Sequence, residues 1–327
     1  VNEWCWNSLA RHADIILPCT TTLERRDIGM TPRDPYVISM EKAIEPICEA
    51  RNDYDIFAGI ARYMGNEETF TQGRSAEDWQ QWIWEQSREQ AAKLNIQMPD
   101  YQNFRETGFY KSPELNEDRI FLSEFFNNPD TNPLKTPSGK IELYSKTIDS
   151  FNYDNCPGHP TWMEPAEWLG AKNKNYPLHL ISNQPKTKLH SQMDNGALSS
   201  SIKIKGHQPL EMNPVDAKDR GITDGDIVRV FNKRGACLCG VNITNDVMPG
   251  VVIISTGSWY DPVDPTDPNS MCKHGNPNVL SPDIGTSKLG QGPAAHSCLA
   301  EIELYDGPAQ NITAFDPPEI IKNRNAQ

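Results

Sequence analysis

The stretch L-H-L-I-S-N-Q-P-K-T-K-L-H-S-Q, residues 178–192, joins a short apolar run to a polar loop. Three of its first four residues are apolar and predict a strand, which ends at Ser182. Pro185 stiffens the loop, because its ring fixes φ and it has no backbone N–H. Loops at strand ends often carry binding residues but are also simply polar. Two interpretations therefore stay open: a plain surface loop, or a binding site for a ligand with many hydrogen-bond acceptors.

The chain that follows this loop alternates short strands with tight turns. A helix is predicted over 214–220 with Asn213 as its N-cap, then strands at 227–231 and 236–243 around an N-K-R-G turn. M-P-G-V-V-I-I-S, residues 248–255, leads into another strand. Many short strands with glycine turns favour a small closed β-barrel. We therefore expect a barrel domain over residues 176–327.

Residues 1–135 have the pattern of an α/β domain with a parallel sheet and a helical insert. A-D-I-I-L-P, residues 13–18, is a short apolar run ended by proline and predicts a buried parallel strand. An amphipathic helix is expected over 49–64, since Ile56, Phe57, Ile60 and Met64 recur at helical spacing. The predicted fold class is thus α/β followed by β.

A second helix is predicted over 74–95. Ser75 is the expected N-cap, and Asp78 lies three residues later as in the acidic form of a capping box. Trp79, Trp82 and Ile83 share one face, which we expect to be the packing face.

Residues 136–175 form a predicted connector between the two domains. Ile141 and Leu143 alternate with polar residues after a turn and predict a strand. The proline-containing segment that follows is expected to be extended and to pack Trp162 and Trp168.

Composition narrows the possible partners. The 327 residues are 37% hydrophobic and 23% charged, with a formal net charge of −13. An acidic surface repels nucleic-acid backbones and anionic membranes, so neither is an expected partner. No apolar run reaches the roughly 20 residues that span a bilayer, so no membrane span is expected.

The eight cysteines contain no C-x-x-C pair, which argues against zinc or iron–sulfur spacing. Cys237 and Cys239 would lie on the same face of one strand and are not expected to bridge to each other. Reduced, structural cysteines weakly favour a reducing compartment. The chain opens V-N-E-W-C-W, without an initiator methionine, and we expect it to be a fragment.

Several segments, in order, resemble one enzyme family. They are A-D-I-I-L-P (13–18) with T-T-L-E-R-R-D (21–27), A-R-N-D-Y-D (50–55), P-S-G-K-I-E (137–142), C-P-G-H-P-T-W (156–162), K-L-H-S-Q (188–192), N-P-N-V-L (276–280) and T-S-K-L-G-Q-G (286–292). Together they resemble the C-terminal part of the molybdopterin oxidoreductases of the dimethyl sulfoxide, trimethylamine N-oxide and biotin sulfoxide reductase group, the biotin sulfoxide branch most of all. T-P-R-D-P-Y, residues 31–36, departs from the family pattern.

The resemblance implies a double-psi β-barrel that caps an α/β domain. It implies a Mo-bis(molybdopterin guanine dinucleotide) cofactor and oxygen-atom transfer from a sulfoxide or N-oxide substrate, with a protein or a reduced nicotinamide or flavin system as electron donor. The family's molybdenum ligand and substrate pocket lie upstream. We therefore expect the N-terminal remainder of the same enzyme as a partner, no catalytic or metal-ligating residue in this chain, and no activity from the chain alone.

The resemblance also implies two nucleotide contacts near the N-terminus. Arg25 would contact a phosphate or the guanine edge; a surface ion pair of Arg25 with Glu24 or Asp27 is the alternative. Asp53 would accept two hydrogen bonds from guanine, although a carboxylate there is also favoured as a helix cap or by the helix dipole. Asp55 is a neighbouring candidate.

Further cofactor contacts are implied in the barrel. They are Ser182, Asn183, Gln184, Pro185, Lys188, His190, Ser191, Gln192, Asn278, Ala295 and His296. Asn278 would contact a pterin, or alternatively would satisfy backbone groups next to Pro277.

Two other functions stay open. One is a non-catalytic barrel that only binds, because a barrel of this kind is a weak functional signal. The other is a nitrate- or formate-type molybdenum enzyme. A cytoplasmic location is favoured over a periplasmic one.

Overall fold

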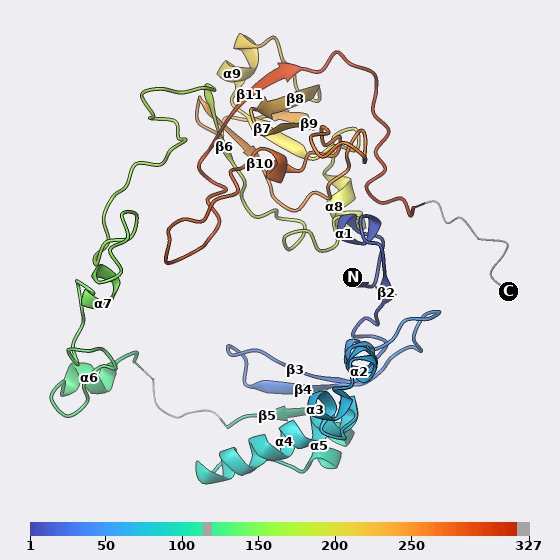
Figure 1. Cartoon of the computed structure of the whole chain (residues 1–327), viewed down its shortest axis with the longest axis vertical. Helices are drawn as coiled ribbons and strands as arrows, with labels where there is room; N and C mark the ends of the chain where they lie inside the picture. The colour runs from blue at the N-terminus through green and yellow to red at the C-terminus, as the bar shows by residue number, and fades with distance from the viewer. Residues whose placement is uncertain (114–119, 319–327) are drawn as a thin grey trace. The chain divides into compact units, whose positions relative to one another are not determined.

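A computed structural model describes residues 1–113 and 120–318 of the chain. The chain divides into two compact units, Val1–Asn128 and Pro129–Gln327, and Figure 1 shows the helices and strands of each. The units are described separately here.

The second unit is built on a closed six-stranded barrel. Its strands follow one another around the barrel in the order β10-β6-β11-β8-β9-β7. Their bounds are β6 Leu178–Ile181, β7 Pro209–Met212, β8 Ile227–Asn232, β9 Gly235–Ile243, β10 Val251–Ile254 and β11 Cys298–Leu304. The predicted strands at 178–181, 227–231, 236–243 and after Gly250 are confirmed, as is the antiparallel pairing of β8 with β9.

Side-chain alternation explains why this segment closes into a barrel. β8 alternates half-buried and buried residues along its whole length, as expected of a strand with one face in a core. β9 instead has six consecutive buried residues, Ala236 to Val241, because it is covered on both faces. The barrel core contains Leu178, Leu180, Leu210, Met212, Val228, Val230, Val241, Val252, Ile254, Leu280 and Ile302, together with four cysteines.

The second unit also contains short helices: α7 Lys146–Asp149, α8 Ala197–Ser201, α9 Pro214–Asp219 and the 3-10 helix η1 Pro277–Val279. The predicted cap of α9 is confirmed, since the Asn213 side chain accepts a hydrogen bond from the Val215 N–H at 2.9 Å. The same side chain donates to the Val247 carbonyl at 2.7 Å and so ties α9 to the barrel.

The first unit contains eleven elements in its described residues. They are β1 Asn2–Glu3, α1 Ser8–Arg11, β2 Leu17–Pro18, β3 Asp27–Met30, β4 Tyr36–Met40, α2 Asp53–Tyr63, α3 Glu67–Thr71, α4 Ala76–Lys93, α5 Tyr101–Thr107, β5 Phe109–Lys111 and α6 Ser123–Asn127. β3, β4 and β5 form an antiparallel sheet, and β1 pairs with β2 in parallel.

The predicted buried strand over 13–18 is wrong in extent and burial. Only Leu17–Pro18 is a strand, with β1 as its parallel partner, and Ile15 is 70% exposed. A strand in a parallel sheet is buried when other elements pack on both faces of the sheet. Among the described residues, no element buries the two-stranded β1–β2 sheet in this way. The larger sheet of this unit is antiparallel, so the expectation of a parallel sheet holds only for the β1–β2 pair.

The helix predicted over 74–95 is present as α4, and its capping box is confirmed. Ser75 accepts a hydrogen bond from the Asp78 N–H, and the Asp78 side chain accepts one from the Ser75 N–H. The predicted packing face is wrong. Trp82 and Ile83 are exposed, whereas Trp84 is 3% exposed and stacks on Phe104 with ring centroids 3.7 Å apart. The partner, α5, selects the face that is buried, and the helix sequence alone does not identify that partner.

Two further expectations need correction. The helix predicted over 49–64 begins at Asp53, after Asn52 as N-cap, and of its apolar face only Ile56 is buried. The strand predicted at Ile141 and Leu143 does not form, and these side chains are 66% and 84% exposed. Alternation predicts a strand only where another strand pairs with it, and none does here among the described residues.

The six strands and the flanking helices make the chain a mixed α/β protein with a closed barrel. Among the described residues, no helix combines the length and apolar character that crossing a membrane requires. All eight cysteines are free thiols.

Candidate functional site

The barrel gathers the predicted binding segments at one of its ends. β10 runs parallel to β6, with Ile253 beside Ile181, so both strands end at the same place. β11 runs antiparallel to β6, with Cys298 beside Leu180, so β11 begins there. The loop after β6 and the residues before β11 are therefore neighbours, although more than a hundred residues separate them in the sequence.

The start of the 182–192 loop is anchored to the end of β10. The Asn183 carbonyl accepts a hydrogen bond from the Thr256 N–H at 2.9 Å, and its side-chain oxygen accepts one from the Ser255 hydroxyl at 2.7 Å. The neighbouring Ser182 is 8% exposed, and its buried hydroxyl has no hydrogen-bond partner. The same is true of the Thr187 hydroxyl.

The tip of the loop presents polar side chains to solvent. Gln184 and His190 are exposed and lie 3.1 Å apart, from Nε2 to Nδ1. His190 has a φ of +51°, a left-handed conformation, and its carbonyl turns toward Gly257. Ser191 and Gln192 are also exposed, and the Gln192 N–H donates to the Leu189 carbonyl at 3.0 Å. Pro185, which follows Gln184 in the sequence, is half-buried.

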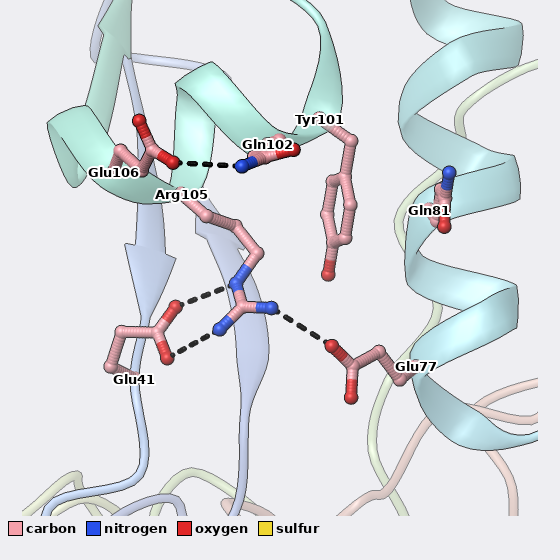
Figure 2. Close-up of a pocket in the computed structure, with 7 residues that line it drawn as sticks. All are labelled: Glu41, Glu77, Gln81, Tyr101, Gln102, Arg105 and Glu106. Atoms are coloured by element: carbon pink, nitrogen blue, oxygen red, sulfur yellow. Dashed lines mark hydrogen bonds and ion pairs between the residues drawn. The ribbon is translucent and has the colours of Figure 1, made fainter.

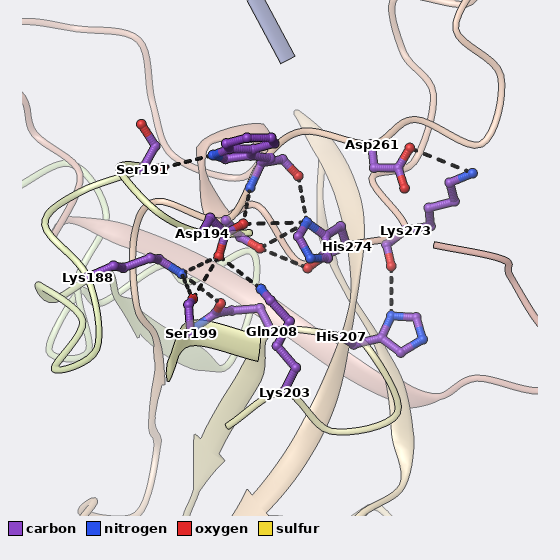
Figure 3. Close-up of polar contacts among 12 residues, drawn as sticks. Lys188, Ser191, Asp194, Ser199, Lys203, His207, Gln208, Asp261, Lys273 and His274 are labelled. Carbon is purple, nitrogen blue, oxygen red and sulfur yellow. Dashed lines mark hydrogen bonds and ion pairs between the residues drawn. The ribbon is translucent and has the colours of Figure 1, made fainter. Parts of the chain in front are cut away.

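Lys188 faces inward, in contrast to its neighbours. Its ammonium group is fully buried and lies 2.6 Å from Asp194 Oδ1 and 3.4 Å from both Ser199 Oγ and Gln208 Oε1 (Figure 3). The sequence-based assignment treated Lys188 as a direct cofactor contact. The structure places its charge in a buried ion pair, where it supports the loop from behind.

Asp194 is the centre of this buried network, which the sequence analysis missed. Its Oδ2 accepts a hydrogen bond from the Trp259 N–H at 2.9 Å, and the Trp259 indole N–H donates to the Ser191 carbonyl at 2.8 Å. His274 Nδ1 lies 3.8 Å from Asp194 Oδ2 and 2.9 Å from the Trp259 carbonyl. These residues are separated by up to 83 positions, so no local sequence pattern could have grouped them.

The segment before β11 is held by a histidine on β6. His179 Nε2 donates to the His296 carbonyl at 2.6 Å, and His179 Nδ1 accepts from the Leu169 N–H at 3.1 Å. Both bonds together require the tautomer with its proton on Nε2. The His296 side chain is exposed, and Ala295 is half-buried beside it.

Asn278 lies on η1 with its side chain exposed. The side chain that caps η1 is that of Asn276, which accepts from the Asn278 N–H at 2.9 Å. The alternative role of Asn278, satisfying backbone next to Pro277, is thus performed by Asn276. The following Leu280 carbonyl accepts from Asn232 Nδ2 at 2.9 Å and from Arg234 Nε at 2.6 Å.

An ion pair fastens the connector to this end of the barrel. The Arg234 guanidinium binds the Glu167 carboxylate through two bonds of 2.6 and 2.8 Å, and Glu167 also accepts from the Leu299 N–H at 3.0 Å. The bonds from Arg234 hold the pKa of Glu167 below its usual value. Because Arg234 also reaches Leu280, this pair ties together the segments that carry Asn278 and His296.

In the first unit, Arg25 and Asp53 are placed on separate segments. Arg25 pairs with Asp27, which is one of the two alternatives given for it, but its buried Nε has no hydrogen-bond partner. Asp53 is the first residue of α2 and accepts from Asn2 Nδ2 at 3.4 Å, while Asn52 provides the cap. Asp55 is exposed.

Buried polar atoms without a partner concentrate in the predicted loops. Among the described residues there are five: Thr20 Oγ1, Arg25 Nε, Ser182 Oγ, Thr187 Oγ1 and His274 Nε2. Two belong to the 182–192 loop, two to the 20–27 segment, and one to the network around Asp194. Such atoms are rare in folded proteins because each costs roughly 1–3 kcal/mol, so their location makes these segments candidates for binding a polar ligand.

A hollow on the first unit is a weaker candidate. It is lined by Arg105, three glutamates and other polar residues (Figure 2). Arg105 is bound on one side by Glu41, at 2.9 and 3.0 Å, and on the other by Glu77, at 2.8 Å. Since these carboxylates satisfy the cation, the hollow has no free positive group for an anionic ligand.

Comparisons with known proteins identify the family that the chain resembles. Residues 178–299 match the family model described as the molydopterin dinucleotide binding domain, and residues 1–63 match the model of the molybdopterin oxidoreductases. The chain is 44% identical over 323 residues to a dimethyl sulfoxide/trimethylamine N-oxide reductase of Cereibacter sphaeroides, covering 98% of this chain and 39% of that protein. It is 43% identical over 320 residues to a trimethylamine-N-oxide reductase of Salmonella typhimurium, covering 96% and 37%.

The chain thus spans about two fifths of the length of the curated relatives that it matches. Among solved structures, acetylene hydratase from Pelobacter acetylenicus superposes with a TM-score of 0.64 and 20% identity, over 91% of this chain and 39% of that one. A likeness at this identity shows the fold alone.

Proposed function

Since the chain belongs to the molybdopterin oxidoreductases, we propose that it is the C-terminal, cofactor-binding part of a molybdenum-dependent S-oxide or N-oxide reductase. The observation that carries the proposal is the gathering of the 182–192 loop, the Asn278 segment and the segment before β11 at one end of the barrel. The relatives named as dimethyl sulfoxide and trimethylamine N-oxide reductases support the substrate class.

The residues at this end fit a Mo-bis(molybdopterin guanine dinucleotide) cofactor. Such a cofactor presents phosphate, guanine and pterin groups rich in hydrogen-bond acceptors. The exposed side chains of Gln184, His190, Ser191 and Gln192 offer donors, and the buried hydroxyls of Ser182 and Thr187 lack partners. A ligand atom that accepts from these hydroxyls removes the cost of leaving them unsatisfied.

The role of this chain is to bind and orient the cofactor. When bound, the cofactor supplies two-electron oxygen-atom transfer, which reduces the S-oxide or N-oxide to the sulfide or amine. We propose that the exposed side chains of the 182–192 loop and the side chain of Asn278 form hydrogen bonds with the cofactor. The His296 backbone, held by His179, positions Ala295 and His296 at the same end.

In the first unit, we assign the nucleotide contacts to Arg25 and Asp53. The unpartnered Arg25 Nε supports a phosphate or guanine contact even though Asp27 takes part of the same guanidinium. Asp53 has only one long hydrogen bond, to Asn2, and its carboxylate retains acceptor sites for the N–H edge of guanine.

Finer assignments remain part of the proposal. The barrel is assigned to the double-psi type, and the domains to residues 1–135, 136–175 and 176–327. We propose that the substrate is either an S-oxide, such as biotin sulfoxide, or an N-oxide. The proposed partners are an electron donor and the N-terminal remainder of the enzyme. The proposed location is cytoplasmic. The free thiols support a reducing compartment.

The test is the cofactor content of the full-length protein, purified from cells that mature molybdenum cofactors. We expect about one molybdenum and two GMP per protein after acid release, since the proposed cofactor contains two guanine dinucleotides, and strongly reduced content in the His190→Ala/Asn278→Ala variant. A matched variant, His159→Ala/Asn311→Ala, removes the same residue types at exposed positions outside the site and should retain the wild-type content.

Absence of both molybdenum and GMP from the wild type would contradict the oxidoreductase proposal and favour a barrel that only binds. Cofactor with no turnover of dimethyl sulfoxide, trimethylamine N-oxide or biotin sulfoxide, but turnover of nitrate or formate, would favour the other class of molybdenum enzyme.

A further inference from the structure

A buried group of three charges lies behind the 182–192 loop. We call Lys188, Asp194 and Lys203 the charge cluster (Figure 3). Both ammonium groups contact the same oxygen, Asp194 Oδ1, at 2.6 and 3.0 Å. The side chains of Lys188, Asp194 and Lys203 are 0%, 0% and 5% exposed, so water screens none of them.

The charges in this cluster do not balance. Burial acts to raise the pKa of Asp194, but Lys203 and Lys188 together hold it below its usual value, so the carboxylate is ionised at neutral pH. Burial lowers the pKa of Lys203, and the negative charge of Asp194 opposes that effect. Two ammonium groups share one carboxylate, which leaves a formal excess of one positive charge.

No neighbouring group among the described residues supplies the second negative charge. His274 is neutral at pH 7, because burial and then Lys203 lower its pKa to about 4. Asp261 is buried but is already paired with Lys273 at 3.7 Å and with the Thr313 N–H and hydroxyl at 2.7 and 2.8 Å. The remaining contact of Lys203 is the ring of Phe315, at 5.7 Å.

We propose that the charge cluster is an electrostatic anchor, whose uncompensated positive charge draws an anionic part of the dinucleotide to the 182–192 loop. The proposal rests on the proposed function. A positive charge held in a low-dielectric interior acts over several ångströms with little screening. Lys203 would therefore contribute to anion binding without touching the ligand.

The contacts of the cluster direct this charge toward the loop. Lys188 belongs to the loop itself and places its ammonium group beneath it. Asp194 also holds Trp259, which binds the Ser191 carbonyl at the loop tip. The unpartnered hydroxyls of Ser182 and Thr187 lie in the same loop and independently indicate a ligand there.

The proposal separates affinity from stability. Removing one member of a buried ion group is costly when it leaves another charge without compensation. Removing the Lys203 charge leaves a balanced Lys188–Asp194 pair. The fold should keep or gain stability, while the affinity for the anionic cofactor should fall.

The experiment compares Lys203→Met and Lys203→Gln with wild type in the full-length holoenzyme. Gln keeps an N–H donor for Asp194 while removing the charge. We would measure the rate at which protein-bound GMP is lost on gel filtration, and the melting temperature of cofactor-free protein. Lys205→Met is the matched control, since it removes a lysine charge two residues away at an exposed position.

We expect both Lys203 variants to lose GMP roughly tenfold faster, the effect of one unit charge over about 10 Å at an effective dielectric near 20. Their cofactor-free melting temperatures should equal or exceed that of wild type, and Lys205→Met should match wild type in both measurements. GMP loss at the wild-type rate in either Lys203 variant would overturn the inference, and so would faster loss accompanied by a lower melting temperature in both. Wild-type protein without GMP would instead refute the proposed function.

Discussion

At the scale of single residues, Gly257 has the strictest requirement in the binding site. Its φ is +93°, and a Cβ atom placed on it would lie 1.8 Å from the His190 carbonyl oxygen. His190 itself adopts a left-handed φ of +51°. The two backbones therefore approach so closely that only glycine fits, and this contact sets the position of the loop tip.

Gly257→Ala should lower the free energy of unfolding by about 2–4 kcal/mol, since strain at positive φ adds to a backbone clash. It should also reduce cofactor content, because the loop must move away. The control is Gly225→Ala, where φ is +80° but no atom lies within 4 Å of the added Cβ; there we expect about 1 kcal/mol. Urea unfolding measures the free energy of unfolding of both variants. Equal losses in Gly257→Ala and Gly225→Ala would show that the close approach of Gly257 to His190 does not affect stability.

His274 is the residue through which pH acts on the buried network. Its pKa is lowered to about 4, chiefly by burial, while the unfolded chain binds a proton near 6.5. The folded form therefore resists a proton that the unfolded form accepts. The contribution of neutral His274 to the free energy of unfolding is therefore fully present above pH 6.5. It is lost as the pH falls from 6.5 toward 4.

We expect this loss to reach roughly 3.5 kcal/mol at a pH below 4, from about 2.5 pH units at roughly 1.4 kcal/mol each. The difference in unfolding free energy between wild type and His274→Gln, measured by urea unfolding from pH 7.5 to 4.5, should shrink as the pH falls. His159→Gln, an exposed position on the connector, should give a difference that stays flat with pH. If the difference in unfolding free energy between wild type and His274→Gln also stays constant with pH, the role of His274 in the pH dependence is contradicted.

At the scale of elements, the connector acts as a brace for the barrel. Glu167 lies in a segment without regular secondary structure, yet it joins the β8–β9 turn to the start of β11 through Arg234 and Leu299. Arg234 extends the brace to the carbonyl of Leu280, just after η1. The brace helps to hold η1, and with it the exposed Asn278, in a fixed place.

Arg234→Met should lower the free energy of unfolding by about 2–3 kcal/mol, because it leaves the half-buried Glu167 without its bidentate partner. Cofactor content should fall with it, since Leu280 is released. Arg229→Met removes an arginine of the same barrel whose pair with Glu303 is exposed, and there we expect less than about 1 kcal/mol. Urea unfolding and GMP content measure the two effects, and similar stability in both variants would refute the brace.

At the scale of the whole molecule, the second unit contains the candidate binding site at one end of the barrel, and the first unit contains two candidate nucleotide contacts. It spans about two fifths of the length of its relatives. Among the described residues, no group of three histidine, cysteine or carboxylate side chains is arranged to hold a metal ion. Acetylene hydratase from Pelobacter acetylenicus shares the fold although its name gives a different reaction from those of the reductases, so the fold by itself does not define the reaction.

The proposed function predicts that the 327-residue chain produced alone shows no reduction of dimethyl sulfoxide or trimethylamine N-oxide with a reduced dye as electron donor. The full-length protein, assayed beside it, should reduce at least one of them. Turnover by the isolated chain would show that it contains the complete reaction site and would contradict the proposed division of roles.

Local patterns in the sequence were sufficient for several elements. Alternation placed β8 and β9, the Asn213 and Ser75 caps placed α9 and α4, and the K-L-H-S-Q motif marked the loop whose buried hydroxyls lack partners. These features depend on residues within a few positions of one another, and their physical causes, capping bonds and side-chain periodicity, are local.

Other features depended on partners distant in the sequence. Trp84 rather than Trp82 is buried because α5 packs on that face, and Ile141 and Leu143 remain exposed because no strand pairs with them. Lys188 points inward because Asp194 and Gln208 are there to receive it. The sequence by itself determined four of the six barrel strands and the family, and it predicted that the polar loop after β6 binds a ligand. Only the tertiary structure decided which polar residues are exposed at that end of the barrel and which pair in the interior, since burial and charge pairing arise only when distant segments meet.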